Sequence, residues 1–478
     1  MENRSIFLNL SPLDHRYYLA NRALFDALAQ CLSEEASIRY AVKTELALLK
    51  AHVRFHFPEK DQKRLLGALE GLEDKIDPAE VYAEEEKTQH NIRAMVNILK
   101  KFIPEELNAY VHLGATSVDM LDTAQSLKVR DAVLQVILPL LADLELELCK
   151  ICAAEADTPQ IGRTHGQYAV PITLGFALGE YVSRLGKSIL KIKELAGDVK
   201  GKLAGAVGSY NATSVITPDP QGFEKAFLSE LGLEPSEHST QMVEPEYLLR
   251  LLLEINVAFG VIANLADDLR NLQRSEISEV REEFTSTQVG SSTMPQKRNP
   301  WNSEHVKSLW KAFAPRVMTF FMDQISEHQR DLTNSASTRF ISDYLAGFTA
   351  AVSRMKKVLT TLKVNKDRLN DNITKAGDMV LAEAVYIILS LAGDVEGHET
   401  VRKLTLTAEK EGTPLVKALQ SDPDLWKTLE TQLKKSTGRD AQEFFSHPEL
   451  YHGIGPMKAR ELASKYKTAM VTLKENLK

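Results

Sequence analysis

Apolar residues recur every three or four positions over several long stretches of this chain. Such spacing places them on one face of a helix. Between Ala124 and Ala156 the pattern predicts a long helix, which Pro139 should kink without ending, because proline lacks the N–H of the helical ladder. The apolar positions of this helix are Val133, Ile137, Leu140, Leu144, Leu148 and Ile151.

Four further long helices are predicted on the same grounds. Pro245 suits the first turn of one of them, where its missing N–H has no partner to lose. The chain shows no sustained alternation of apolar and polar residues and no strand–helix–strand rhythm. The sequence therefore predicts an all-α fold. The four predicted helices span residues 173–194, 245–274, 303–325 (with a kink at Pro315) and 344–362.

The stretch Leu248–Ala266 is apolar on nearly every side. It resembles a membrane span in length, but Arg250 and Glu254 lie within it, and charges inside spans are rare. We expect a buried helix of a bundle, completed by other subunits, and no membrane contact.

Two changes in the sequence pattern divide the chain into three predicted domains. The stretch Gly114–Ser117 separates a first helical domain from the long helices, and after residue 364 the predicted helices become shorter and more charged. We expect an N-terminal domain, a central long-helix bundle and a small C-terminal helical domain. Their predicted limits are 1–115, 116–364 and 365–478.

Composition restricts the class of protein. The 478 residues include 58 Lys and Arg and 65 Asp and Glu, which gives a formal net charge of −7. This balance argues against a nucleic-acid binder. The chain has three cysteines, too few for a disulfide framework, and its first residues lack the pattern of a signal peptide. We expect a cytoplasmic protein.

Two patterns that could indicate metal sites are weak. Cys149 and Cys152 form a C-x-x-C motif inside a predicted helix, without a second pair or a histidine at zinc spacing. Asp267 and Asp268 project from different sides of a helix, and no second acidic cluster accompanies them. No metal site is predicted.

Four polar loops interrupt the helical background. In GRTHGQ, glycines flank a segment that contains His165. The backbone can turn sharply there and expose an imidazole suited to proton transfer near neutral pH. The alternative is a histidine that caps a helix or bonds to a carbonyl.

Two other loops can hold anions. VHLGATSVDMLDTA places Thr116 and Ser117 at the start of a long helix, where they can cap the helix or help its N-terminus to bind an anion. QRDLTNSASTRF places Arg330 and Arg339 on either side of a hydroxyl-rich segment. Arginine can hold a carboxylate or phosphate through two hydrogen bonds.

The fourth loop, GSSTMPQKRNP, spans residues 290–300. Lys297 and Arg298 can bind an anion, and a serine at 291 or 292 can act as nucleophile or base only if its hydroxyl is activated. Neither a G-x-S-x-G elbow nor a phosphate-binding P-loop pattern surrounds them.

Together the four loops resemble, in the same order, the conserved segments of the fumarase/aspartase superfamily of lyases. The match of GSSTMPQKRNP to the superfamily's signature loop is highly specific. Three motifs, LSPLDHRY, EKTQHNIRAMV and QRDLTNSASTR, resemble in particular the branch that eliminates fumarate from succinylated purine nucleotides. The resemblance spans about residues 10–345.

The resemblance implies an all-α, three-domain fold whose central bundle is shared across a homotetramer. It also implies active sites built from three chains and no metal or organic cofactor. The implied reaction is elimination of fumarate to leave AMP, and the analogous cleavage of an aminoimidazole carboxamide ribotide.

This elimination needs a base for a C–H beside a carboxylate, an acid for the departing nitrogen, and positive charge near the carbanion. By position in the motifs, Ser291 is the implied base and His165 the implied acid. His90 is expected to orient the succinyl group. Lys297 is expected to stabilise the serine alkoxide under a loop that closes over the substrate.

Further positions match residues that hold the succinyl carboxylates, ribose or phosphate. Asn302 and Glu304 are weaker matches, and Asn91 stands where an aspartate is common. The implied substrate-binding residues are Arg16, Tyr17, Gln89, His90, Asn91, Thr116, Ser117, Gln241, Ser292, Lys297, Arg298, Asn299, Asn302, Arg330, Ser335, Ala336, Ser337, Thr338 and Arg339.

Two other functions remain open. One is another lyase of the superfamily, such as argininosuccinate lyase. The other is a catalytically inert structural relative. The joint presence of His90, His165, Ser291 and Lys297 argues against the inert protein, which needs none of them.

Overall fold

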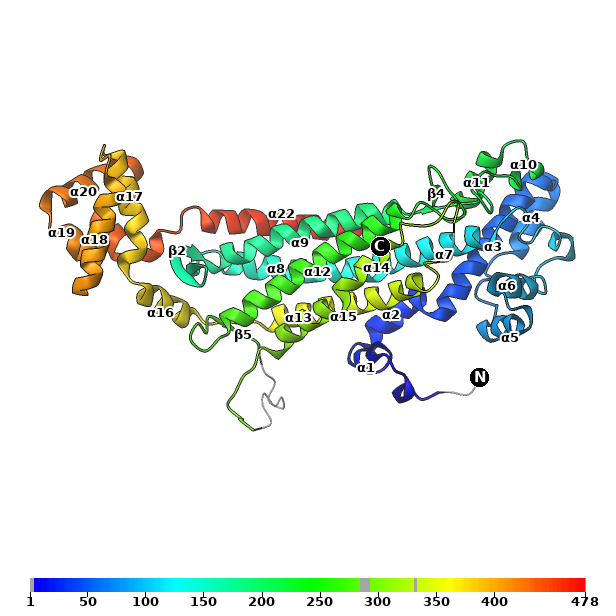
Figure 1. Cartoon of the computed structure of the whole chain (residues 1–478), viewed down its shortest axis with the longest axis horizontal. Helices are drawn as coiled ribbons and strands as arrows, with labels where there is room; N and C mark the ends of the chain where they lie inside the picture. The colour runs from blue at the N-terminus through cyan, green and yellow to red at the C-terminus, as the bar shows by residue number, and fades with distance from the viewer. Residues whose placement is uncertain (1–3, 284–292, 331–332, 478) are drawn as a thin grey trace.

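Long helices lie side by side in a bundle at the centre of the molecule (Figure 1), and their contacts close into a ring. The computed structural model of the chain describes residues 4–283, 293–330 and 333–477. Around the ring α8 packs on α9, α9 on α12, α12 on α13, α13 on α15 and α15 on α8, while α22 lies against both α8 and α9. These helices are α8 (Leu138–Ala154), α9 (Leu174–Gly197), α12 (Glu246–Leu272), α13 (Trp301–Phe313), α15 (Ile341–Thr361) and α22 (Gly455–Asn476).

The kink predicted at Pro139 is found as a change of helix type. Helix α7 (Ser117–Ala132) passes into a π-helical segment, Val133–Ile137, and then into α8. The wider π turn ends two residues before Pro139 and accommodates a residue that has no N–H to donate. At 1.5 Å per residue, the run from Ser117 to Ala154 is roughly 55 Å long.

The other predicted long helices are confirmed to within a few residues. Helix α9 begins after Thr173, whose hydroxyl accepts a hydrogen bond from the Phe176 N–H at 3.2 Å. The predicted helix over 303–325 is interrupted at Pro315, as expected. It consists of α13, a 3-10 turn, Ala314–Arg316, and α14 (Val317–Met322).

Helix α12 is the apolar stretch that resembles a membrane span. Within the described residues it is long and apolar enough to cross a membrane by length and composition, but 56% of its most apolar window is buried inside this chain. It packs against α9 and α13, which confirms the predicted bundle helix. Val257 on its outer face is 53% exposed, so this chain alone does not cover all its sides.

An antiparallel hairpin was not predicted. Strand β1 (Pro159–Thr164) pairs with β2 (Gln167–Thr173), with an irregularity of register between Ile161 and Arg163. This irregularity and the short strands disrupt the alternation that would reveal a strand. The remaining described strands are the two-residue segments β3 (Lys200–Gly201) with β4 (Glu234–Pro235), parallel, and β5 (Val280–Arg281) with β6 (Lys363–Val364), antiparallel.

The N-terminal helices cover one end of the bundle (Figure 1). Helix α3 packs on α7 and α11 packs on α3, and their buried residues join those of the bundle in one continuous core. The helices of this region are α1 (Arg16–Ala20), α2 (Arg22–Leu32), α3 (Glu34–His56), α4 (Glu59–Ala68), α5 (Pro78–Thr88), α6 (Asn91–Leu99), α10 (Thr213–Ile216) and α11 (Pro220–Ser229).

The C-terminal part differs from the predicted domain 365–478. Buried residues between Leu381 and Phe445 form a small core of their own, but the final helix, α22, runs back along the bundle (Figure 1). Its apolar face joins the main core. The helices outside the bundle are α16 (Lys366–Ala376), α17 (Ala382–Leu391), α18 (Gly397–Glu411), α19 (Leu415–Gln420), α20 (Pro423–Thr437) and α21 (Ala441–Ser446).

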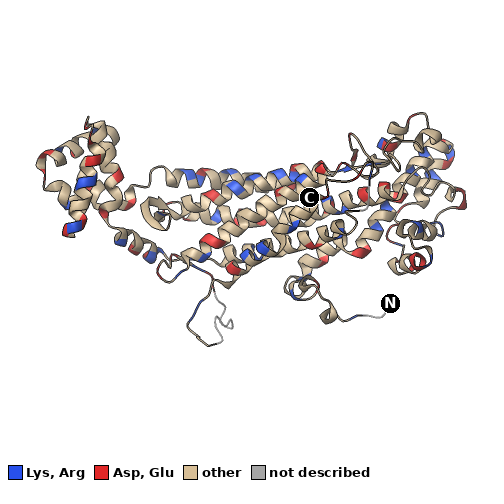
Figure 2. Ribbon diagram, in the orientation of Figure 1, with Lys and Arg blue, Asp and Glu red and all other residues tan. Residues whose placement is uncertain are grey.

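Short 3-10 segments complete the described structure, and charge is spread along it. Figure 2 shows acidic and basic residues interspersed on the long helices in this view. The 3-10 segments not yet given are η1 (Ile6–Leu8), η2 (Pro12–Asp14), η3 (Glu105–Leu107), η6 (Ser337–Phe340), η7 (Asp378–Leu381) and η8 (Pro448–Leu450).

A buried histidine in α3 makes stability depend on pH. His52 is 0% exposed, its Nε2 lies 3.0 Å from the Leu113 carbonyl oxygen, and its Nδ1 has no partner. Burial lowers the pKa of His52 from 6.5 to about 4. The unfolded chain therefore binds more protons between these values, and the free energy of unfolding falls as the pH drops from 6.5 towards 4.

We expect this loss to reach about 3 kcal/mol for His52. The variant His52→Gln should lack this part of the pH dependence, as measured by urea unfolding at pH 7 and pH 4.5. His447→Gln, which changes an exposed histidine in the C-terminal helices, is the matched control and should retain it. An unchanged pH slope in His52→Gln would contradict the assignment.

Candidate active site

His165 lies at the tip of the hairpin. Thr164 pairs with Gln167, so His165 and Gly166 form a two-residue turn. Both have positive φ, 54° and 74°, as in the type I′ turns that match the twist of a hairpin. Both residues are exposed. The predicted sharp turn and exposed imidazole are found, although the turn joins two strands.

Strand β1 of the hairpin is held by a buried carboxylate, Glu279. Its Oε1 accepts from Arg163 at 2.6 Å and from the Asn372 amide at 2.8 Å, while its Oε2 accepts from Gln160 Nε2 at 2.7 Å. Glu279 directly precedes β5, from which the chain continues towards the signature loop. The hairpin and one end of that loop therefore share a rigid anchor.

A second buried carboxylate, Glu282, holds the other end of the signature loop. Its Oε1 accepts from the N–H and hydroxyl of Ser303 at 2.8 and 2.7 Å, and its Oε2 accepts from Asn302 Nδ2 at 2.8 Å. These contacts fix the first turn of α13. The sequence analysis missed both glutamates, since EISEVREEF shows no pattern that distinguishes them from surface acids.

The signature loop is described from residue 293 onward. The implied base Ser291 and its neighbour Ser292 lie outside the described residues. Lys297 and Arg298 are exposed and Asn299 is half-buried. The Lys297 N–H donates to the Met294 carbonyl at 3.0 Å, and the Arg298 carbonyl accepts from Gln273 Nε2 at 3.2 Å.

Arg16 and Tyr17 lie in α1 beside α13. The Tyr17 hydroxyl is 2.9 Å from His305 Nε2. Burial, with the charges of Arg354 and Arg16, lowers the pKa of His305 below its usual value. The Arg354 guanidinium donates to Asn302 Oδ1 at 2.9 Å. The structure thus brings Arg16, Tyr17 and Asn302 into one cationic region, and Glu304 is exposed on the same helix.

Gln89, His90 and Asn91 form the exposed junction between α5 and α6. Gln89 has a left-handed φ of 53°, which ends α5. His90 Nδ1 accepts from the Arg93 N–H at 3.3 Å and caps α6. Asn91 lines a cavity whose walls include Leu121 of α7, so this junction lies near the start of that helix.

Thr116 and Ser117 are half-buried at the start of α7. The Thr116 N–H donates to Asp119 Oδ2 at 2.8 Å, and Thr116 and Asp119 form a capping box. The predicted cap is confirmed. The same N-terminus presents backbone N–H groups and a favourable dipole to an anion, so the predicted anion site remains compatible with the geometry.

Gln241 and Arg330 lie on adjoining segments. The Gln241 N–H donates to the Gln329 carbonyl at 3.1 Å, and the Arg330 guanidinium contacts Met242 and the side chain of Asn334.

The stretch 335–339 follows Arg330. Ser335, Ala336 and Arg339 are exposed, and Ser337 and Thr338 are half-buried. The Ser337 hydroxyl contacts both carboxylate oxygens of Asp323 at 2.8 Å. Arg339 lies near Tyr82 of α5. Burial and the charge of Glu34 raise the pKa of Tyr82 to about 12, and the positive charge of Arg339 opposes this rise.

These groups occupy different ends of the helical bundle (Figure 1). The His165 hairpin lies beyond the C-terminal end of α8, whereas Thr116 lies at the N-terminal end of α7. The continuous run between them is roughly 55 Å long, at 1.5 Å per residue. One chain therefore does not bring His165 together with Thr116 or with the His90 junction near it.

The comparisons identify the family. A sequence model described as "Lyase" matches residues 17–314, and one described as "Adenylosuccinate lyase C-terminal" matches residues 326–440. The chain is 31% identical to the adenylosuccinate lyase of Pyrococcus horikoshii, over 95% of this chain and 96% of that protein. The chain belongs to the adenylosuccinate lyase family.

Other members of the adenylosuccinate lyase family are similarly distant. The Thermotoga maritima enzyme is 30% identical over 83% of this chain and 90% of its own. Among solved structures, the 3-carboxy-cis,cis-muconate lactonizing enzyme of Pseudomonas putida has a TM-score of 0.76 at 24% identity, covering 93% of this chain and 98% of that one. A fumarate lyase from Mesorhizobium sp. BNC1 has a TM-score of 0.75 at 21% identity, with 92% and 97% covered. These two structures show the fold, which is the all-α one expected.

The side chains that could have indicated metal sites are buried or paired with other protein groups. Cys149 and Cys152 are buried thiols, and burial raises the pKa of Cys152 to about 12. Asp267 forms ion pairs with Arg270 and Lys307, and Asp268 accepts from the Tyr181 hydroxyl. Over the described ranges, no group of three or more His, Cys, Asp or Glu side chains could hold a metal ion.

Proposed function

We propose that this protein eliminates fumarate from adenylosuccinate to leave AMP, and that it also cleaves succinyl-aminoimidazole carboxamide ribotide in purine biosynthesis. The observation that carries the proposal is the similarity to adenylosuccinate lyases over nearly the whole chain, 95% of it at 31% identity. We further propose that it acts in the cytoplasm as a homotetramer.

In the proposed reaction Ser291 removes the proton from the carbon beside a succinyl carboxylate. The electron pair left on carbon forms the double bond of fumarate as the C–N bond breaks. His165 donates a proton to the departing nitrogen, which becomes the amino group of AMP. The exposed position of His165 on a two-residue turn supports this role, because a substrate can reach the imidazole without unfolding the hairpin.

Positive charge is needed where the intermediate accumulates negative charge. Lys297 in the signature loop is proposed to stabilise the ionised serine, and Arg16, Arg330 and Arg339 are proposed to hold carboxylate or phosphate groups. His90 is proposed to orient the succinyl group. The N-terminus of α7, with Thr116 and Ser117, offers N–H donors to the same kind of anion.

The proposed reaction requires active sites shared between subunits, because of the length of the helical run from α7 to α8. His165 and the start of α7 are separated by a helical run of roughly 55 Å, at 1.5 Å per residue. A substrate of nucleotide size cannot touch both within one chain. The exposed apolar residues on α12 and α14, such as Val257 at 53% and Met318 at 56%, support association with other copies.

The proposed substrate is tested by ultraviolet absorbance. Purified protein is given adenylosuccinate and, separately, argininosuccinate. We expect consumption of adenylosuccinate with release of fumarate and AMP, and no turnover of argininosuccinate. Consumption of argininosuccinate alone would assign the chain to another lyase activity, and consumption of neither would favour an inert relative.

A further inference from the structure

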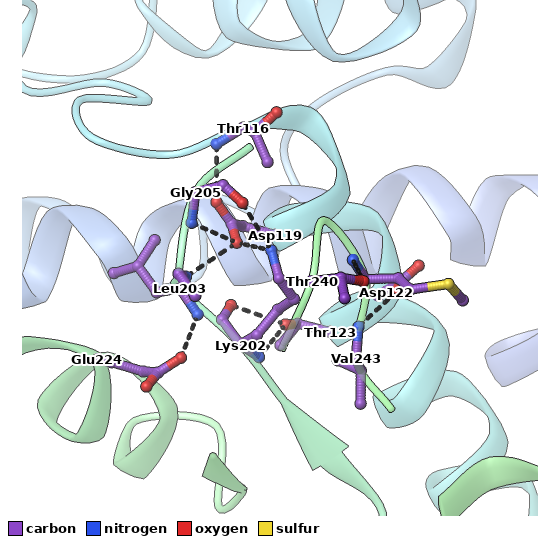
Figure 3. Close-up of polar contacts among 12 residues, drawn as sticks. Thr116, Asp119, Asp122, Thr123, Lys202, Leu203, Gly205, Glu224, Thr240 and Val243 are labelled. Carbon is purple, nitrogen blue, oxygen red and sulfur yellow. Dashed lines mark hydrogen bonds and ion pairs between the residues drawn. The ribbon is translucent and has the colours of Figure 1, made fainter. Parts of the chain in front are cut away.

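Two carboxylates on the first turns of α7 hold two separate loops (Figure 3). Asp119 and Asp122 are three residues apart and so lie on the same side of the helix. Asp119 contacts the segment after β3, and Asp122 contacts the segment that carries Gln241. The sequence analysis gave Asp122 no role.

The Asp119 side chain is fully buried. Asp119 and Lys202 are both 0% exposed and form an ion pair. Asp119 Oδ1 also accepts from the N–H groups of Ala204 and Gly205 at 3.2 and 3.3 Å, while Oδ2 accepts from the Thr116 N–H at 2.8 Å. A buried carboxylate with this many donors is a rigid support, so the first turn of α7 has a fixed position.

Asp122 extends from this fixed turn to the next loop. Its Oδ2 accepts from the Val243 N–H at 3.1 Å (Figure 3). Two residues earlier in the chain, the Gln241 N–H donates to the Gln329 carbonyl at 3.1 Å. The loop is thus held at Val243 by α7 and at Gln241 by the segment that carries Arg330.

Asp122 also lines a cavity of about 80 Å³. Its other walls include Met242 and Asn334, which are the two residues that the Arg330 side chain contacts. The carboxylate therefore lines the same cavity as the two side chains that contact Arg330, and one of these, Met242, directly follows Gln241 in the chain. Gln241 and Arg330 are substrate contacts under the proposed function, on which this inference rests.

We propose that Asp122 is a positioning residue that fixes the Gln241 segment relative to the N-terminus of α7, and thereby sets the affinity for the nucleotide substrate. It acts through the Val243 N–H and does not touch the reacting atoms. Its loss leaves a backbone donor without its partner and frees the loop that carries Gln241.

The test compares Asp122→Ala, Asp122→Asn, Gln241→Ala and the double variant Asp122→Ala/Gln241→Ala. We expect Asp122→Ala to raise KM for adenylosuccinate about tenfold, the effect of losing one hydrogen bond of this kind, with kcat changed less than about threefold. Asp122→Asn keeps an oxygen that accepts from Val243 and should restore KM to within about threefold of wild type.

The KM of the double variant should exceed that of Gln241→Ala by no more than about twofold. The effects of two substitutions are not additive when one residue acts through the other. Asp440→Ala is the matched control. Asp440 also accepts a hydrogen bond from a backbone N–H, that of Glu443 at 2.9 Å. It lies in the C-terminal helices, so the KM of Asp440→Ala should equal that of wild type.

A wild-type KM in Asp122→Ala, or multiplication of the two effects in the double variant, would overturn the proposal. If Asp122→Ala does not fold, Asp122→Ser gives the same comparison, because its hydroxyl is shorter than the carboxylate and the same rise in KM is expected. Failure of wild-type protein to consume adenylosuccinate would refute the proposed function instead, and is measured first.

Discussion

Replacing His165 by alanine should lower kcat/KM for adenylosuccinate by a factor of about 10² to 10⁴, the usual contribution of a general acid. The imidazole is the implied proton donor to the departing nitrogen, and it is exposed at the tip of the hairpin. Fumarate release measured at saturating and limiting substrate gives kcat and kcat/KM separately.

The His165 substitution should leave folding intact. The side chain is exposed, so its removal creates no cavity. The φ of 54° is a left-handed conformation that asparagine tolerates better than alanine, and His165→Asn therefore separates loss of the imidazole from strain in the turn. Both variants should lose activity to the same extent while thermal unfolding and oligomer size stay near wild type.

His447→Ala is the matched control for His165. His447 is also an exposed histidine, 3.0 Å from a Glu449 carboxylate oxygen in the C-terminal helices. Its removal should leave kcat/KM at the wild-type value. Activity of His165→Asn above about a hundredth of wild type would contradict the assignment of His165 as the acid, because the smallest contribution expected of a general acid is about 10²-fold.

Mixing two inactive variants should restore activity. His165→Ala and His90→Ala each remove one implied catalytic residue. The β1–β2 hairpin, which carries His165, and the junction of α5 and α6, which carries His90, lie at opposite ends of the bundle (Figure 1). If a site takes these residues from different subunits, about one quarter of the sites in randomly mixed oligomers contain both wild-type histidines. The recovered activity should approach that fraction of the wild-type value.

The mixing experiment needs subunit exchange and a control pair. The variants are dissociated and reassembled together, and each alone is treated in the same way. A second mixture, His165→Ala with the double variant His90→Ala/His165→Ala, contains no wild-type His165 and should stay inactive. Absence of recovery in the first mixture, with exchange of subunits demonstrated by mass, would exclude shared sites.

The long helices of this protein could be predicted from the sequence because their signals are local. The three- and four-residue spacing of apolar positions and the prolines at 139, 245 and 315 place helices and their interruptions nearly as observed. Glycines beside His165 likewise predict a turn. The strands of the hairpin could not be recognised, because the change of register between Ile161 and Arg163 removes the alternation.

The partners of buried polar groups were not predictable. Glu279 and Glu282 resemble surface acids in the sequence, yet they fix the two ends of the signature loop. Their partners lie at least 20 residues away in the chain. The final helix gives the same lesson. Its composition resembles that of the C-terminal helices, but it packs against α8 and α9.

The sequence by itself determined the helical class, the run of long bundle helices and the chemical groups available for catalysis, since each depends on residues close together in the chain. Only the tertiary structure decided where these groups lie. A helix advances 1.5 Å per residue, so the start of α7 and the His165 turn are separated by the length of the bundle. Which donor meets a buried carboxylate depends on distant segments folding against each other, and no local pattern records that contact.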